Sequence, residues 1–183
     1  MKIYVISGKA KSGKNTFGNL IKEELKNYGY KPCVMHITEP LYSYARNYFE
    51  WNERTNEKPR EFLQKMGIEI IKEKLGKQTF LIDRLIEDIE ILSIFFDTFI
   101  ITDARLKVEL EKLKEKYADV KTIHIIRQNN DNDLSEAEKK HIPEIDLDDY
   151  RNFDYKILNT SIIDLKSKAK QLIITEEKGE KYE

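Results

Sequence analysis

The stretch that decides the fold is residues 2–16, KIYVISGKAKSGKNT, where an apolar run, a glycine-lysine pattern and the start of a helix follow one another directly. The apolar run is typical of a buried strand, and residues 15–28 carry apolar side chains at helical spacing. Between them, Gly8 and Gly13 bound the pattern Gly-x-x-x-x-Gly-Lys. A strand, this pattern and a helix in that order predict a phosphate-binding loop.

The residue types in this loop suit an anion. Gly8 and Gly13 let backbone amides approach a phosphate closely, because no side chain obstructs them. Successive amides form a concave anion site, and the helix start adds a partial positive charge of about 0.5. Lys14 brings a movable cation to the terminal phosphates, while Ser12 and Thr16 bring hydroxyl donors. The alternative, a glycine-rich turn with surface lysines, is disfavoured by the flanking strand and helix.

Asn15 departs from the strict form of the pattern, because Ser or Thr usually holds Mg²⁺ at that position. A hydroxyl follows one residue later, at Thr16. An Asn oxygen can bind Mg²⁺ directly or through water, so we expect Asn15 to be a metal ligand.

Charge and composition exclude several classes of protein. The 183 residues include 32 basic and 33 acidic side chains, which gives a net charge of −1 and argues against a surface devoted to nucleic acid or anionic membrane. Cys33 is the one cysteine, so no disulfide forms within the chain, and three histidines do not supply a four-ligand zinc framework. No apolar run approaches the roughly 20 residues of a membrane span, and the N-terminal run is too short for a signal peptide. We expect a cytoplasmic protein with no membrane partner.

Short apolar runs alternate with longer amphipathic ones. The predicted strands are residues 2–7, 32–38, 97–102, 121–126 and 154–158, and the predicted helices are residues 15–28, 41–51, 60–75, 79–92, 106–117 and 161–174. Strands separated by helices imply right-handed crossovers and a parallel sheet covered on both faces. We expect one domain over residues 1–183, with a core of residues 1–40 and 93–175, a helical insertion at 41–92 and a lid at 127–149.

A second group of polar residues follows the third predicted strand, in the stretch Thr102-Asp103-Ala104-Arg105. Functional groups gather at the carboxyl ends of strands in an open parallel sheet. There Asp103 can hold Mg²⁺ or its water shell, and Arg105 can fork onto a phosphate. The alternative is that Asp103 caps the next helix and that Arg105 is solvated.

Three further side chains are candidates. Arg60 and Gln64 lie one turn apart on one helix face, which would suit a phosphate and a base edge, although from the spacing alone a solvated helix face is the better explanation. Arg127 ends the fourth strand, either as a charge-neutralising group at the lid or as a surface residue.

Together these residues resemble the deoxynucleoside monophosphate kinase family of phages and bacteria. Four segments carry the resemblance, in the family's order: SGKAKSGKNT at residues 7–16, PREFLQKMGIEIIK at 59–72, TDARLKVE at 102–109 and FDYKILN at 153–159. Lys72 stands where the family often has Arg, and His141-Ile-Pro143-Glu144 replaces its usual His-x-Ser-Glu near the lid, so the acceptor and the lid chemistry stay open.

The resemblance implies an α/β P-loop NTPase fold, with a five-stranded parallel sheet in the order 2-3-1-4-5, flanking helices, a helical acceptor-binding insertion and a lid. It implies that Lys14 contacts the donor phosphates, that Asp103 organises Mg²⁺ or the acceptor, and that Arg127 supports the transfer. The implied acceptor site consists of Arg60, Gln64 and Arg105. The implied ATP site consists of Gly8, Lys11, Ser12, Gly13, Lys14, Asn15, Thr16 and Asn159.

The resulting hypothesis is a kinase that moves the γ-phosphoryl group of ATP, with Mg²⁺, to a nucleoside or deoxynucleoside monophosphate. Its partners would be small-molecule nucleotides and no nucleic acid; a homodimer stays open. Two alternatives stay open as well: a dephospho-coenzyme A kinase or other small-molecule kinase, and a nucleotide-binding module that switches a partner without catalysis. The hypothesis predicts one cleft lined by Lys9, Lys11, Lys14, Arg60, Arg105 and Arg127.

Overall fold

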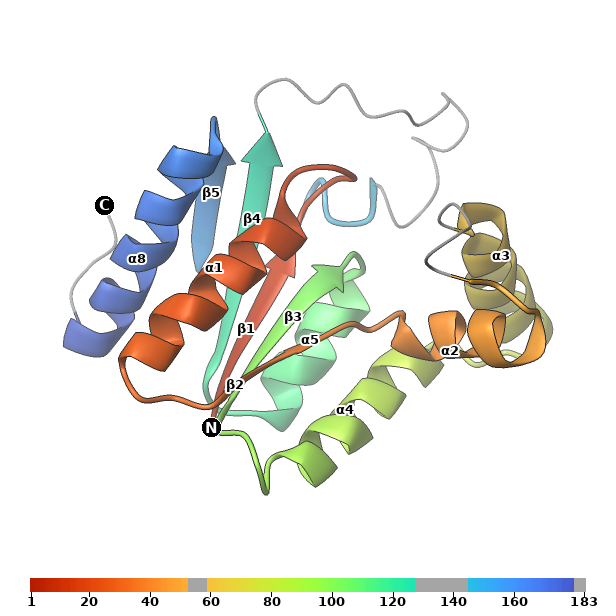
Figure 1. Cartoon of the computed structure of the whole chain (residues 1–183). Coiled ribbons are helices and arrows are strands. Elements are labelled where there is room, and N and C mark those ends of the chain that lie inside the picture. The colour runs from red at the N-terminus through yellow and green to blue at the C-terminus, as the bar shows by residue number, and fades with distance from the viewer. Residues whose placement is uncertain (53–58, 128–144, 180–183) are drawn as a thin grey trace.

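One parallel sheet organises the molecule. The structure, a computed structural model, describes residues 1–52, 59–127 and 145–179. Within these residues the sheet has five strands in the order β2-β3-β1-β4-β5, which confirms the predicted order (Figure 1). The strands are β1 (Lys2–Ser7), β2 (Pro32–Met35), β3 (Thr98–Ala104), β4 (Val120–Arg127) and β5 (Tyr155–Asn159).

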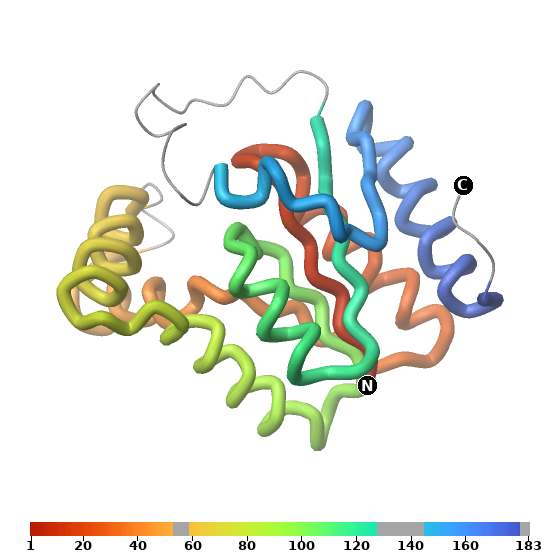
Figure 2. Tube along the Cα trace, turned by 180° about the vertical axis from the view of Figure 1, so that it is seen from behind, coloured from red at the N-terminus to blue at the C-terminus, as the bar shows by residue number. Residues whose placement is uncertain are grey.

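Helices cover both faces of the sheet (Figures 1 and 2). On one face lie α1 (Lys14–Asn27) and α8 (Ile162–Lys178), and on the other lie α4 (Phe80–Leu92) and α5 (Lys107–Lys116). Successive side chains of β1 point to opposite faces of the sheet and so contribute to the hydrophobic core on each face. Tyr4 packs with α1 and α8, and Val5 packs with α4 and α5. Two buried faces explain why the strands are continuously apolar.

A group of helices separates β2 from β3, and we call it the helical insertion. It contains α2 (Glu39–Tyr48), α3 (Arg60–Gln64), the π-helix η1 (Lys65–Lys74) and α4. The single helix predicted at 60–75 is therefore α3 continuing into η1, because apolar periodicity does not distinguish the two hydrogen-bond patterns. Figure 1 shows the insertion to one side of the sheet.

The register brings the carboxyl ends of the strands to one edge. Ser7 of β1 pairs with Ala104 of β3 and with His124 of β4, and Arg127 of β4 pairs with Asn159 of β5. Segments that follow these strands therefore begin close together, which is where an open α/β sheet places its ligands.

Several predicted boundaries change by one to four residues. β2 ends at Met35 instead of residue 38, and the amides of Ile37 and Thr38 bond to Asp103. The last helix continues to Lys178 instead of 174. Ser161 is its N-cap, since its Oγ accepts a hydrogen bond of 3.1 Å from the Asp164 amide.

The predicted lid lies mostly outside the described residues, as do His141, Pro143 and Glu144. None of the helices in the described part of the chain is long and apolar enough to cross a membrane.

Candidate active site

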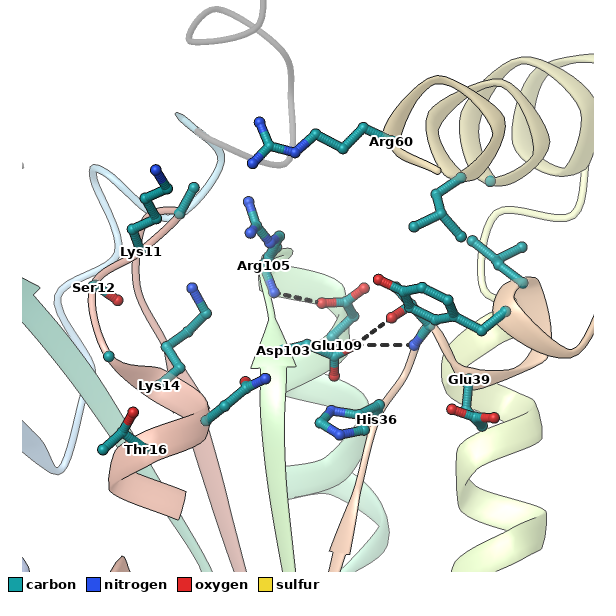
Figure 3. Close-up of a pocket in the computed structure, with 18 of the residues that line it drawn as sticks. Lys11, Ser12, Lys14, Thr16, His36, Glu39, Arg60, Asp103, Arg105 and Glu109 are labelled. Carbon is teal, nitrogen blue, oxygen red and sulfur yellow. Dashed lines mark hydrogen bonds between the residues drawn. The ribbon is translucent and has the colours of Figure 1, made fainter. Parts of the chain in front are cut away.

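A cavity of about 1330 Å³ lies at the carboxyl edge of the sheet, between the loop after β1 and the helical insertion. It brings together all but two of the residues predicted for the site, since Gly8 and Lys9 are absent from its lining. The predicted residues that line it are Lys11, Ser12, Gly13, Lys14, Asn15, Thr16, Arg60, Gln64, Asp103, Arg105, Arg127 and Asn159. Figure 3 shows Lys11, Lys14, Arg60 and Arg105 around one space.

The loop between β1 and α1 has the backbone that its glycines allow. Gly8 has φ 143° and Gly13 has φ 101°, conformations that residues with a Cβ rarely adopt. A Cβ at Gly8 would lie 2.4 Å from the Ile125 carbonyl oxygen, and one at Gly13 would lie 2.6 Å from Asn159 Nδ2. The backbone of Lys11 is also in the left-handed conformation, with φ 59°. Gly8 therefore shapes the loop without lining the cavity.

Lys14 lies within this loop. Its Nζ donates hydrogen bonds of 2.6 Å to the Gly8 carbonyl and 2.7 Å to the Lys9 carbonyl, and the residue is 7% exposed. Ser12 Oγ is buried and has no hydrogen-bond partner in the described structure. Such an unpaired hydroxyl is uncommon in a protein interior. A lysine held at the loop and a hydroxyl that lacks a partner fit the phosphates of ATP.

Two side chains from neighbouring strands hold the loop. Asn159 Nδ2, at the end of β5, donates a hydrogen bond of 2.8 Å to the Ser12 carbonyl. Arg127 Nη1, at the end of β4, donates one of 3.1 Å to the Lys11 carbonyl. Both residues line the cavity, so they can also contact a ligand there.

The prediction that Lys9 belongs to the cleft is wrong. Lys9 is absent from the cavity lining, and its Nζ forms an ion pair of 3.2 Å with Asp148. The Lys9 side chain points from the loop toward residues 145–150. The spacing of residues in the sequence does not reveal that direction.

Asp103 binds protein groups from the segment after β2. Its carboxylate accepts hydrogen bonds from the Ile37 amide at 2.8 Å, the Thr38 amide at 3.0 Å and Thr38 Oγ1 at 2.6 Å. The alternative that Asp103 caps the next helix is therefore wrong. Glu109 caps α5 instead, because its Oε2 accepts hydrogen bonds from the amides of Arg105 and Leu106.

Arg105 places a partly buried cation at the cavity. Burial lowers the pKa of its guanidinium, although the carboxylates of Asp103 and Glu109 raise it. Arg60, from α3, is a second cation near enough to lower that pKa further. Two arginines that approach each other beside a cavity favour an anionic ligand.

The residues present fit Mg²⁺ bound mainly through substrate phosphates. Asn15 and Asp103 both line the cavity, and Mg²⁺ in such sites needs only one or two protein ligands. Within the described residues no cluster of three His, Cys, Asp or Glu side chains could hold a metal alone.

Sequence reasoning assigned no role to several residues that line the cavity. Tyr42 and Trp51 contact each other, with ring centroids 5.6 Å apart. Arg46 forms an ion pair with Glu39, and both line the cavity. Glu109 was noted only within a family-like segment. Arg46 and the aromatic pair carry no local motif, so only the fold reveals their position.

Comparisons with known proteins support the fold. No family model and no curated protein matches the chain. Among solved structures, an APS kinase of Mycobacterium tuberculosis in complex with AMPPNP and APS is 14% identical, with a TM-score of 0.56 and coverage of 96% of this chain and 97% of that one. A shikimate kinase of Bacteroides thetaiotaomicron is 13% identical, with a TM-score of 0.54 and coverage of 96% and 98%. A sugar kinase of Janibacter is 12% identical, with a TM-score of 0.53 and coverage of 100% and 99%.

The chain has the P-loop kinase fold. The matched structures span its whole sheet and insertion, but identities of 12–14% establish architecture and leave the acceptor open. The narrower resemblance to deoxynucleoside monophosphate kinases stays a prediction from four sequence segments.

Proposed function

We propose that the protein transfers the γ-phosphoryl group of ATP to the phosphate of a nucleoside or deoxynucleoside monophosphate. One observation carries this proposal: a single cavity joins the phosphate loop to a second set of cations, Arg60 and Arg105, which lies outside that loop. Figure 3 shows Lys14 on one side of that space and Arg60 on the other. An acceptor with its own phosphate would account for the second set.

The phosphate loop supports the ATP half of the proposal. The backbone amides of the loop and the Lys14 ammonium would bind the donor phosphates. The matched APS kinase, which has the same fold, is in complex with AMPPNP, an ATP-like nucleotide. When bound, Mg²⁺ would neutralise phosphate charge, and Asn15 and Asp103 are the residues that would hold it.

A phosphate acceptor also agrees with the state of Asp103. Such an acceptor is already ionised at neutral pH, so the transfer needs positioning and charge neutralisation and no strong base. Three hydrogen bonds from Ile37 and Thr38 fix the Asp103 carboxylate in place, so its role would be to hold Mg²⁺ and not to take a proton from a hydroxyl. Lys14, Arg105 and Arg127 would instead stabilise the charge of the transferred group.

An ADP-release assay with ATP, Mg²⁺ and a panel of acceptors tests the proposal. We expect ADP release that depends on a nucleoside or deoxynucleoside monophosphate. Release that depends on dephospho-coenzyme A, shikimate or a sugar would replace the proposal with another small-molecule kinase. Nucleotide binding without acceptor-dependent release would favour a non-catalytic switch.

A further inference from the structure

Glu109 is a buried acid that lines the cavity and that the proposed transfer does not use. It lies in the first turn of α5, and only 8% of its surface is exposed. Carboxylates are seldom buried so deeply without several partners. Figure 3 shows the Glu109 side chain beside Arg105 and Asp103.

The two carboxyl oxygens of Glu109 differ in their surroundings. Oε2 accepts hydrogen bonds of 2.7 Å from the Arg105 amide and 2.9 Å from the Leu106 amide. In the described structure every hydrogen bond to the Glu109 side chain ends on Oε2. Oε1 is therefore a carboxylate oxygen at the cavity that accepts no hydrogen bond from the described residues.

The groups around Glu109 stabilise its ionised carboxyl group only in part, so a further hydrogen-bond donor would be favourable there. Burial raises the pKa of Glu109 to about 7, and the two amides at Oε2 offset only part of that effect. The Asp103 carboxylate raises the pKa further, whereas the Lys72 ammonium lowers it. A hydrogen bond from a ligand to Oε1 would stabilise the ionised carboxyl group at this position.

The position of Glu109 indicates which part of an acceptor it would meet. In Figure 3, Glu109 lies on the side of Arg105 that faces away from Lys14. The lining of the same cavity also includes the apolar residues Leu41 and Ile68 and the aromatic residue Tyr42. Such a lining suits the sugar and base of a nucleotide.

We propose that Glu109 is a specificity-determining residue whose Oε1 accepts a hydrogen bond from a donor on the nucleoside part of the acceptor, either a sugar hydroxyl or a ring N–H group. This inference rests on the proposed function, because it assumes that the acceptor is a nucleotide.

Glu109→Gln tests the inference without removing the helix cap. The amides of Arg105 and Leu106 both need an acceptor, so the new amide oxygen must take the Oε2 position. Its NH₂ group then takes the Oε1 position, which turns the acceptor at the cavity into a donor. The matched control is Glu111→Gln, the same chemical change at an exposed position of α5.

We expect Glu109→Gln to lower kcat/KM for the monophosphate about 10- to 100-fold, mainly through KM, because the lost hydrogen bond involves a charged group. The KM for ATP should stay close to that of Glu111→Gln, and the melting temperature at pH 7 should be no lower than that of Glu111→Gln. A purely capping role predicts an unchanged acceptor KM in Glu109→Gln, and that result would overturn the inference.

Acceptor analogues distinguish the two kinds of donor. If Oε1 accepts from a sugar hydroxyl, removing that hydroxyl should weaken binding to the wild type and have little effect on Glu109→Gln. If the donor is a ring N–H, methylation of that nitrogen should weaken binding to the wild type and have little effect on Glu109→Gln. In either case the effects of the analogue and of the substitution are non-additive. Equal losses with every analogue in both proteins would contradict the inference.

The wild-type assay separates this inference from the proposed function. Monophosphate-dependent transfer by the wild type, with the same acceptor KM in Glu109→Gln, would reject the role of Glu109 alone. Absence of transfer to every monophosphate would reject the proposed function and the role of Glu109 with it.

Discussion

The side-chain amide of Asn159 donates a hydrogen bond of 2.8 Å to the backbone carbonyl of Ser12. The last strand of the sheet thereby holds the loop that follows the first strand, across 147 positions of sequence. Because a Cβ at Gly13 would meet the same Nδ2 atom, the loop and Asn159 fit closely together. The shape of the phosphate site thus depends on β5 as well as on its own glycines.

Asn159→Ala should loosen the phosphate loop. We expect the KM for ATP to rise about tenfold, because one neutral hydrogen bond that positions the Ser12 carbonyl is lost. The acceptor KM should change little. Steady-state kinetics with each substrate varied in turn measures both values, and Asn19→Ala, at an exposed position of α1, is the control. A larger change in the acceptor KM than in the KM for ATP would argue against a role at the loop.

Arg60→Ala should weaken the acceptor and spare ATP. An arginine that binds a phosphate contributes charge-assisted hydrogen bonds, so we expect the acceptor KM to rise about 10- to 100-fold. Arg84→Ala is the control, because Arg84 is an exposed arginine that pairs with Asp88 on α4. Product formation at varied acceptor concentrations tests this, and equal acceptor KM values in the two variants would contradict the assignment.

Asp103→Asn should destabilise the fold even without ligands. Three donors face the Asp103 carboxylate, and the NH₂ group of Asn would oppose one of them. We expect a loss of about 1–3 kcal/mol in the free energy of unfolding, measured by urea denaturation. Thr38→Val, which removes only the hydroxyl donor, should cost about 1 kcal/mol. Unchanged stability in both variants would show that these bonds contribute little.

Glu109 should make stability depend on pH. Its pKa is about 7 in the folded protein, against about 4.3 for an exposed Glu. The folded state therefore binds an additional proton between these values, and the stability from the protonated group is lost as the pH rises through about 7.

The free energy of unfolding of the wild type, relative to Glu109→Gln, should fall by on the order of 3 kcal/mol from about pH 4.3 to about pH 7. Urea denaturation of both proteins across that window measures the difference. A difference that stays constant, or that grows with pH, would contradict the raised pKa.

The loop and the strand order could be predicted from the sequence for different reasons. The loop is local, since its strand, glycines, Lys14 and helix are contiguous in the chain. The sheet order came from the family resemblance, because apolar runs reveal strands and do not order them. Asp103 was placed correctly at a strand end, but its partners Ile37 and Thr38 lie about 65 residues away and follow only from the packing of β2 against β3.

The role of Glu109 escaped prediction because the usual sequence signal is absent. A capping box is expected where Ser or Thr stands three residues before Glu, whereas the N-cap residue here is Leu106. The Glu109 carboxylate nevertheless accepts from the N-cap amide. The hydrogen bond from the N-cap amide to Glu therefore forms although the Ser or Thr of the capping box is missing.

The most direct test of the central claim follows the γ-phosphoryl group itself. With γ-labelled ATP, Mg²⁺ and a nucleoside monophosphate, we expect the wild type to place the label in the nucleoside diphosphate. Lys14→Ala should fold normally and transfer at least about 100-fold more slowly, because the cation at the phosphates is lost. Lys26→Ala, the same change at an exposed position of α1, should behave as the wild type. A folded Lys14→Ala variant with wild-type transfer, or label released only as inorganic phosphate by the wild type, would contradict the account.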